Sequence, residues 1–320
     1  MNPNKGTTTP GMKRYLPIAM AILIIFGVGL MVISQKNKTM SEVAKEENSI
    51  GSFTKQQICA RSPQFLQPLK IPQPVVIDLS QKRFKGIAFH YGRKFEKTLH
   101  PKIWEQYEHF STYVMDENGN ILLIPTPFIS ILPTTFNLQK NLYKLDTETG
   151  KLSIFMHFDD IHPSSNNPYG LNAIAYDCDD KTLWAAAIDE SNYESQKGVI
   201  YHINLQTKEI LQKVEGFDVL SMTIARSEKG KYLLVGSARD NGLYAYDMSQ
   251  KKNKFNSIKL FELPLSNERI RKIKVIGHNL LEIQSVPFSY SLIAQSSKKD
   301  RIIYTAKWDE VEKVWIVIKK

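Results

Sequence analysis

Sets of four short apolar segments separated by turn residues recur along this chain, and no other feature of the sequence constrains the fold as strongly. The clearest set begins with Leu171–Tyr176, the polar turn Asp177–Lys181 and Thr182–Ile188, and it continues with Val199–Asn204 and Glu209–Val214. Four strands within about 45 residues, joined by tight polar turns, are typical of one blade of a β-propeller.

The same unit can be followed three more times. Its third strand carries Leu-Tyr or Ile-Tyr in every case, at Tyr143, Tyr201, Tyr244 and Tyr304. The strands of the other units are predicted at Ser111–Met115, Ile121–Ile124, Leu142–Asp146 and Leu152–His157, then Val219–Ala225, Tyr232–Ser237, Leu243–Asp247 and Ile258–Leu263, then Ile270–Ile276, Leu280–Val286, Ile302–Ala306 and Val314–Ile318.

Residues 65–109 are less regular. Val75–Leu79 and Arg83–His90 predict a hairpin, followed by a short helix at Lys102–His109. Because a propeller closes so that no sheet lacks a neighbour, this region supplies a fifth blade or strands that complete the last one. We predict an all-β domain, a β-propeller of five four-stranded blades, with six blades as the alternative. A β-sandwich has similar short strands, but it lacks the repeated four-strand unit.

A membrane span is predicted at Leu16–Ile33, where eighteen consecutive residues carry no charge. As a helix it covers roughly 27 Å, close to the thickness of the hydrocarbon core of a bilayer. Lys13 and Arg14 precede it, which favours a cytoplasmic N-terminus. The predicted order is a cytoplasmic N-terminus (1–15), a transmembrane signal anchor (16–33), a polar spacer (34–61) and the propeller (62–320).

A cleaved signal peptide is the alternative interpretation of this segment. In both cases the bulk of the chain is exported. The predicted location is the cell (inner) membrane, with a single pass and the propeller in the periplasm.

The net charge of +10 comes partly from residues that flank the predicted membrane segment. Five basic residues flank that segment: Lys5, Lys13, Arg14, Lys36 and Lys38. The remaining charges are nearly balanced and contain no long basic block, so no nucleic-acid partner is expected.

The two cysteines, Cys59 and Cys178, fit an exported domain. If they pair in an oxidising compartment, the bridge closes a loop of about 120 residues and contributes about 4–5 kcal/mol in the chain-entropy model. Two separate free thiols are the alternative, because sequence does not fix their geometry.

The unit that starts at Leu171 reads Leu-Asn172-Ala-Ile-Ala-Tyr, then an Asp-rich turn, a Leu-Trp strand, Asp189 and an Ile-Tyr strand ending at Tyr201. This order resembles a blade of the gluconolactonase, strictosidine-synthase and NHL-type propellers. Gluconolactonase-like enzymes hold a divalent metal with Asn and acidic side chains at the central channel. The resemblance therefore implies a metal beside Asn172, although Ala173 stands where the family pattern has glycine.

Three long loops, Pro125–Lys140, Asp189–Gly198 and Pro287–Asp300, each join the second and third strands of a blade. In a four-stranded meander such loops lie at one end of the propeller, and loops longer than a fold requires are commonly functional. Two of them contain apolar residues, which favours burial against a partner or against each other across the ring mouth. We predict a partner-binding rim whose anchors are Phe128, Phe136, Phe288 and Tyr290.

A second candidate site follows the strand that ends at His157. His157, Asp159, Asp160 and His162 combine imidazole and carboxylate groups, which suit zinc or another divalent ion, although Asp-Asp before a turn is also common loop chemistry. No other cofactor is expected. The sequence contains no Gly-x-Ser-x-Gly, no phosphate-binding glycine loop and no His-Glu-x-x-His.

These features favour a non-enzymatic function: a membrane-anchored propeller that binds a protein partner or a ligand, with an envelope assembly as a candidate setting. The alternative function is a metal-dependent, lactonase-like hydrolase that uses the central channel.

Overall fold

The structure is a computed structural model whose contacts divide the chain into residues 1–49 and residues 50–320. It describes residue 50 and residues 53–55, 59–79, 85–107, 109–127, 136–251, 253–291 and 301–320. The predicted span at 16–33, the spacer as far as residue 49, and Phe128 all lie outside the described residues. In the part that is described, no helix has the length and apolar character needed to cross a membrane.

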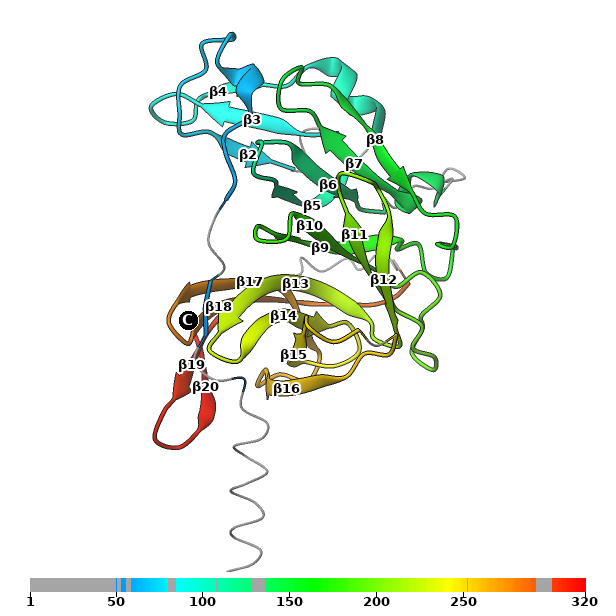
Figure 1. The fold of residues 1–320 in the computed structure, drawn as a ribbon, viewed down its shortest axis with the longest axis vertical. Coiled ribbons are helices and arrows are strands. Elements are labelled where there is room, and N and C mark those ends of the chain that lie inside the picture. Colours follow the sequence, from blue (N-terminus) through cyan, green and yellow to red (C-terminus); the bar gives the residue numbers. More distant parts are fainter. Residues whose placement is uncertain are drawn as a thin grey trace, which may run out of the picture. The chain divides into compact units, whose positions relative to one another are not determined.

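Residues 50–320 form a five-bladed β-propeller (Figure 1). Blade 1 contains β2 (Val76–Asp78), β3 (Ala88–Tyr91) and β4 (Lys97–Leu99). Blade 2 contains β5 (Phe110–Met115), β6 (Ile121–Pro125), β7 (Asn141–Leu145) and β8 (Leu152–His157); blade 3 contains β9 (Leu171–Asp177), β10 (Thr182–Ala187), β11 (Val199–Asn204) and β12 (Ile210–Glu215). Blade 4 contains β13 (Val219–Ser227), β14 (Gly230–Ser237), β15 (Gly242–Asp247) and β16 (Ser257–Glu262); blade 5 contains β17 (Glu268–Gly277), β18 (Leu280–Pro287), β19 (Ile302–Asp309) and β20 (Val314–Lys319).

The repeat predicted from the tyrosines is confirmed. Tyr143, Tyr201, Tyr244 and Tyr304 each occupy the third position of the third strand in a different sheet. The less regular region forms the first blade, with three strands instead of four, and the predicted short helix is a 3-10 helix, η2 (Lys102–Tyr107). The five-blade prediction therefore holds, and blade 1 departs from the four-strand pattern.

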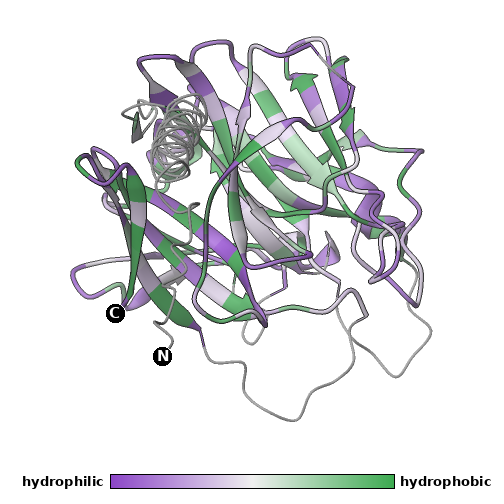
Figure 2. Cartoon of the chain, turned by 90° about the horizontal axis from the view of Figure 1, so that it is seen from below, coloured by the Kyte–Doolittle hydropathy of each residue, from purple (hydrophilic) through white to green (hydrophobic). Residues whose placement is uncertain are grey.

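Hydrophobic clusters fill the spaces between consecutive blades. Between blades 3 and 4, for example, the rings of Trp184 and Tyr246 lie 6.1 Å apart. Buried and exposed positions alternate along much of β17, whereas β6, β9 and β10 are buried at every position. Figure 2 shows hydrophobic colouring along the strands and hydrophilic colouring at many turns. The described residues of blades 1 and 5 share no hydrophobic cluster.

The two ends of the blades differ. Turns between first and second strands, and between third and fourth strands, lie at one end, which we call the turn side. Loops between second and third strands, and the links between blades, lie at the other end, the loop side. The N-terminal part of the domain crosses the turn side.

Strand β1 (Phe53–Lys55) lies in the stretch that the sequence assigned to the spacer. It pairs antiparallel with β13 and is the fifth strand of the blade 4 sheet. The Phe53 amide donates to Oδ1 of Asn279 at 2.7 Å, and the Asn279 amide donates to the Phe53 carbonyl at 2.9 Å. Because Asn279 lies in the β17–β18 turn, β1 joins blades 4 and 5.

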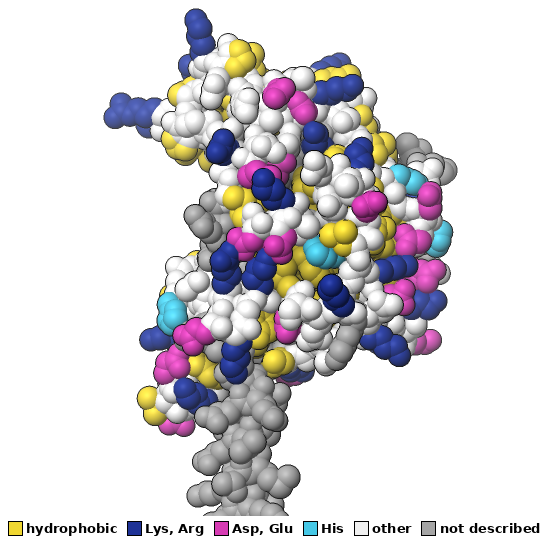
Figure 3. Space-filling model, viewed as in Figure 1, with side chains coloured by type: hydrophobic (Ala, Val, Ile, Leu, Met, Phe, Trp, Pro, Cys, Tyr) yellow, Lys and Arg dark blue, Asp and Glu magenta, His cyan; other side chains and the backbone are white. Residues whose placement is uncertain are grey.

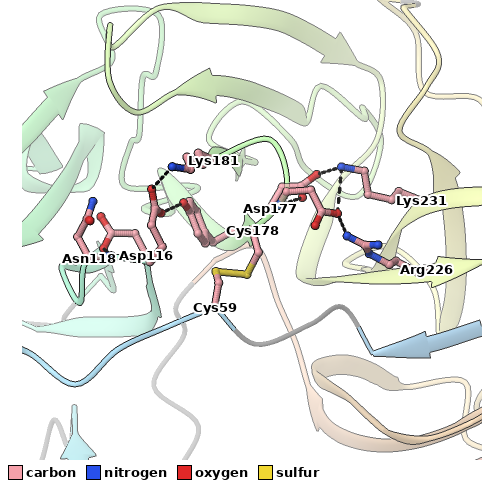
Figure 4. Close-up of a disulfide and its surroundings, with 11 residues drawn as sticks. Cys59, Asp116, Asn118, Asp177, Cys178, Lys181, Arg226 and Lys231 are labelled. Atoms are coloured by element: carbon pink, nitrogen blue, oxygen red, sulfur yellow. Dashed lines mark hydrogen bonds and ion pairs between the residues drawn. A yellow bond between two sulfur atoms is a disulfide. The ribbon is translucent and has the colours of Figure 1, made fainter.

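Residues 59–66 continue across blades 3 and 2. Cys59 and Cys178 form a disulfide at the β9–β10 turn, with their Cα atoms 5.7 Å apart (Figure 4). The Phe65 amide donates to the carbonyl of Thr147, in the β7–β8 turn, at 2.7 Å. The Phe65 ring also packs against Phe89 of β3, in blade 1, with their centroids 5.7 Å apart. The described residues between 50 and 66 therefore contact all five blades.

Ion pairs beside the disulfide hold blade 3 to blade 4 (Figure 4). The Lys231 ammonium lies 2.7 Å from the fully buried Asp177 carboxylate and 2.6 Å from Asp180. Arg226 pairs with Asp179 in the same turn. Burial alone would lower the pKa of Lys231, but the two carboxylates outweigh it and the pKa is raised.

Candidate functional site

The three long loops do arise between the second and third strands, in blades 2, 3 and 5, and so they share the loop side. The β10–β11 loop is described in full. The β6–β7 loop is described at its end, where it forms the 3-10 helix η3 (Phe136–Lys140), and the β18–β19 loop is described at its start, as far as residue 291.

A buried carboxylate, Asp218, fixes the β10–β11 loop to the link that precedes blade 4. Asp218 is 0% exposed. Its Oδ1 accepts hydrogen bonds from Ser191 Oγ at 2.5 Å and from the Gly198 amide at 2.8 Å. Only glycine fits at position 198, because a Cβ there would lie 2.3 Å from the Phe217 carbonyl oxygen. Both ends of the loop are therefore held against one acceptor.

Arg239, in the β14–β15 loop, holds the middle of the same loop. Its guanidinium donates to the carbonyl oxygens of Asn192 at 2.8 Å and Tyr193 at 2.7 Å, and lies 3.8 Å from Asp218 Oδ2. Backbone groups with strong partners of this kind give a loop one defined conformation. The loop is thus a rigid platform built from two blades.

The β18–β19 loop joins this platform through Tyr290. The Tyr290 hydroxyl donates to Asp218 Oδ2 at 2.5 Å, and its ring packs with Leu220, Ile188 and Ala238 in one hydrophobic cluster. Burial, and then the Asp218 carboxylate, raise the pKa of Tyr290. Blades 3, 4 and 5 therefore meet at Asp218.

Among the four predicted rim anchors, the structure brings together Phe288 and Tyr290, whose ring centroids lie 5.3 Å apart. Tyr290 is only 2% exposed, so its ring is used for internal packing across the ring mouth, the alternative that the sequence left open. Phe288 and Phe136 are partly exposed, and Phe128 lies outside the described residues.

The prominent exposed aromatic side chain on this side is Tyr193, which the sequence analysis did not select. It is 66% exposed, and its ring stands edge-on to Tyr290 at 5.4 Å. The sequence signal was weak, because Tyr193 is the single aromatic residue in the polar run Glu190-Ser-Asn-Tyr-Glu-Ser.

The predicted metal-ligand residues do not form one group. On β8, the Nδ1 of His157 lies 2.7 Å from Asn141 Oδ1, and its Nε2 lies 3.4 Å from the almost fully exposed carboxylate of Asp159. Asp160 pairs with Lys213 at 2.8 Å. Within the described part of the chain, no three His, Cys, Asp or Glu side chains gather in a way that could hold a metal ion.

Asn172 lies on β9, the first strand of blade 3, which contacts the neighbouring first strands β5 and β13. Its side chain is 4% exposed. Its Nδ2 donates to the Val219 carbonyl at 2.5 Å, and its buried Oδ1 has no partner within the described residues. A flip of the Asn172 side-chain amide would place its Oδ1 against the Val219 carbonyl oxygen, and two acceptors cannot form a hydrogen bond. The bond to Val219 therefore fixes the orientation in which Oδ1 stays unpaired.

A cleft of about 710 Å³ opens beside the β10–β11 loop. Its walls come from that loop, the β8–β9 link, β11, β12 and the β15–β16 loop of blade 4, and include Asp160, His162, Asp189 and Tyr201. Figure 3 shows histidine, acidic and basic side chains interspersed on the right-hand side of the molecule. Two of the predicted metal-ligand residues, Asp160 and His162, therefore belong to this cleft.

Comparisons with known proteins define the class of the molecule no further than its fold. No protein-family model matches the chain, and no curated protein matches it. Among solved structures, it is similar to the N-terminal domain of Nup159 (15% identity, TM-score 0.39, 85% of this chain and 66% of that chain) and to the Dos1 propeller (13%, 0.38, 73% and 56%). It is also similar to a nidogen–laminin complex (15%, 0.34, 57% and 59%). The chain covers less than two thirds of each of these chains, and at these scores no function can be transferred.

Proposed function

We propose that this protein is a membrane-anchored, extracytoplasmic β-propeller that binds a protein partner with its loop side. The observation that supports the binding role most directly is Tyr193, an exposed aromatic side chain on a loop fixed by Asp218 and Arg239. Tyrosine supplies a large contact area with little loss of conformational entropy, and rigid presentation lowers the cost of binding. Phe288, partly exposed, extends the same surface.

Anchoring and export are supported by two sequence features and one structural feature. The uncharged segment 16–33 has the length of a membrane span, and basic residues precede it. The Cys59–Cys178 disulfide is of a kind that persists in oxidising compartments outside the cytoplasm.

Site-specific photocrosslinking of the full-length chain in its native membrane tests the binding surface. A photoreactive benzoylphenylalanine replaces Tyr193 in one variant and Val311 in the control; Val311 is 86% exposed in the β19–β20 turn, on the turn side. We expect one discrete adduct from position 193 and none from position 311. Equal yields at both positions, or no adduct at 193, would contradict the proposal.

A lactonase-like hydrolase is a second candidate, favoured by one observation: the unpaired buried Oδ1 of Asn172, at the position where the gluconolactonase resemblance implies a metal ligand. That resemblance also implies acidic ligands, and within the described residues no three His, Cys, Asp or Glu side chains are grouped as a metal site. Metal analysis of the purified protein decides between the two. A stoichiometric divalent ion that is lost in Asn172→Ala favours the hydrolase.

A further inference from the structure

The cleft beside the β10–β11 loop contains one carboxylate whose charge the fold leaves without a cation. Asp189 follows β10 and is 9% exposed. Its Oδ2 accepts the His162 amide hydrogen at 2.7 Å. No Lys, Arg or His nitrogen of the described residues forms an ion pair with it, although lysines line the same cleft.

Two of the lysines that line the cleft form ion pairs with other carboxylates. Lys213 lies 2.8 Å from Asp160 and 3.6 Å from Glu215, and Lys197 lies 3.4 Å from Glu190. Lys254 also lines the cleft, from the β15–β16 loop. With four carboxylates and three lysines in its walls, the cleft has a small excess of negative charge, and the buried part of that charge is Asp189.

Leaving a buried carboxylate without an opposite charge is unfavourable, because desolvation is not repaid by an ion pair. The surrounding wall is also partly apolar. Val199 and Phe255 line the cleft and are partly exposed, so they can pack against the methylene groups of a long side chain. A volume of about 710 Å³ accommodates such a side chain together with its neighbouring residues.

We propose that this cleft receives a lysine or arginine side chain of the protein partner, with its cationic end paired to the Asp189 carboxylate. The inference rests on the proposed protein-binding function and adds the chemistry of the contact. Tyr193 and Asp189 belong to the same rigid loop, so an aromatic contact on the outside and an ion pair in the cleft can engage one partner segment. The partner is then expected to present a basic residue beside an apolar one.

The test uses the full-length protein and two blocked pentapeptides, one with a central arginine between alanines and one with citrulline in its place. Citrulline has nearly the shape of arginine but no charge. Titration calorimetry or NMR should show that the arginine peptide binds at least about tenfold more tightly, a difference of about 1.4 kcal/mol. Asp189→Asn retains an acceptor for the His162 amide but removes the charge, and it should abolish that preference.

Asp160→Asn is the matched control, because Asp160 already has Lys213 as its partner. This variant should keep most of the preference. Equal binding of the two peptides by the wild-type protein would overturn the inference, and so would a preference that survives in Asp189→Asn.

Spermidine tests whether the cleft binds free amines instead. If spermidine binds more tightly than the arginine peptide, and this binding depends on Asp189, the assignment to a partner side chain is overturned. A normal photocrosslink at position 193 alongside a negative peptide result would reject this inference and leave the proposed function standing.

Discussion

The hydroxyl of Tyr290 donates to the carboxylate of Asp218 at 2.5 Å, across 72 residues of sequence, and both side chains are buried. Asp218 also accepts from Ser191 and Gly198, so one carboxylate joins loops of blades 3 and 5 at the start of blade 4. These hydrogen bonds fix the β10–β11 loop that presents Tyr193 to solvent.

Removing the Tyr290 hydroxyl should therefore destabilise the loop side. In Tyr290→Phe, Asp218 Oδ2 loses its donor and retains only the more distant Arg239, so we expect a loss of about 1–3 kcal/mol in the free energy of unfolding, measured with urea. Tyr193→Phe is the control, since no hydrogen bond of its hydroxyl is described and its exposure predicts almost no change. Equal stability of both variants would show that the Asp218 bond contributes little.

The disulfide should stabilise the domain through the unfolded state. Cys59 and Cys178 are 119 residues apart, so replacing both with serine should lower the unfolding free energy by about 4–5 kcal/mol in the chain-entropy model. The measurement is urea unfolding without reductant. Under reducing conditions the wild-type protein should unfold at nearly the same urea concentration as the double variant. A wild-type transition that does not respond to reductant would mean that the bridge is not formed in solution.

The position of β1 shows where sequence interpretation reached its limit. The strands of blades 2–5 follow from local patterns of apolar and turn residues, and they were predicted within a few residues. Phe53–Lys55 is three residues long and carries no pattern of its own; it is a strand because β13, about 170 residues later, offers an unpaired edge. No local signal encodes such a pairing.

The candidate site shows the same limit. Loop positions were predictable because blade geometry assigns them to one end. Which aromatic residue is buried depends on Asp218, whose partners Ser191 and Tyr290 are 27 and 72 residues away. Tyr290 and Tyr193 could therefore not be distinguished from the local sequence. Local composition favoured Tyr290 as an anchor, because it has apolar neighbours, whereas the exposed Tyr193 has polar ones.

The buried Asp189 carboxylate should lower the free energy of unfolding at neutral pH by a measurable amount. Burial, aided by nearby Glu190, raises its pKa above the usual value, against the opposing effects of the His162 amide and the His162 ring. A raised folded-state pKa means that this group favours folding below its unfolded pKa of about 3.9, and that this contribution is lost as pH rises through the folded pKa. Asp189→Asn should therefore be more stable than the wild-type protein at pH 7, and the difference should shrink toward zero as the pH falls below about 4.

Urea unfolding at a series of pH values measures this difference. Glu190→Gln serves as the control, because Glu190 is about half exposed and paired with Lys197, and a small effect at every pH is expected. An Asp189→Asn variant that is less stable at pH 7 would show that the carboxylate has a stabilising partner in solution, and the cationic-ligand assignment would lose its physical basis.

Membrane topology can be tested directly with a reporter fused to the C-terminus and with a deletion at the N-terminus. If residues 16–33 form a span with Lys13 and Arg14 on the cytoplasmic side, the C-terminus is exported. In a bacterial host, alkaline phosphatase fused after Lys320 should then be active, and the chain should sediment with membranes at its full mass.

Deleting residues 1–33 should keep the protein in the cytoplasm, leave Cys59 and Cys178 reduced, and inactivate the fused phosphatase. A full-length fusion that is inactive, with reduced cysteines, would reverse the predicted orientation. An active fusion whose chain has lost the mass of the N-terminal segment would instead identify that segment as a cleaved signal peptide, and would leave export intact while rejecting the anchor.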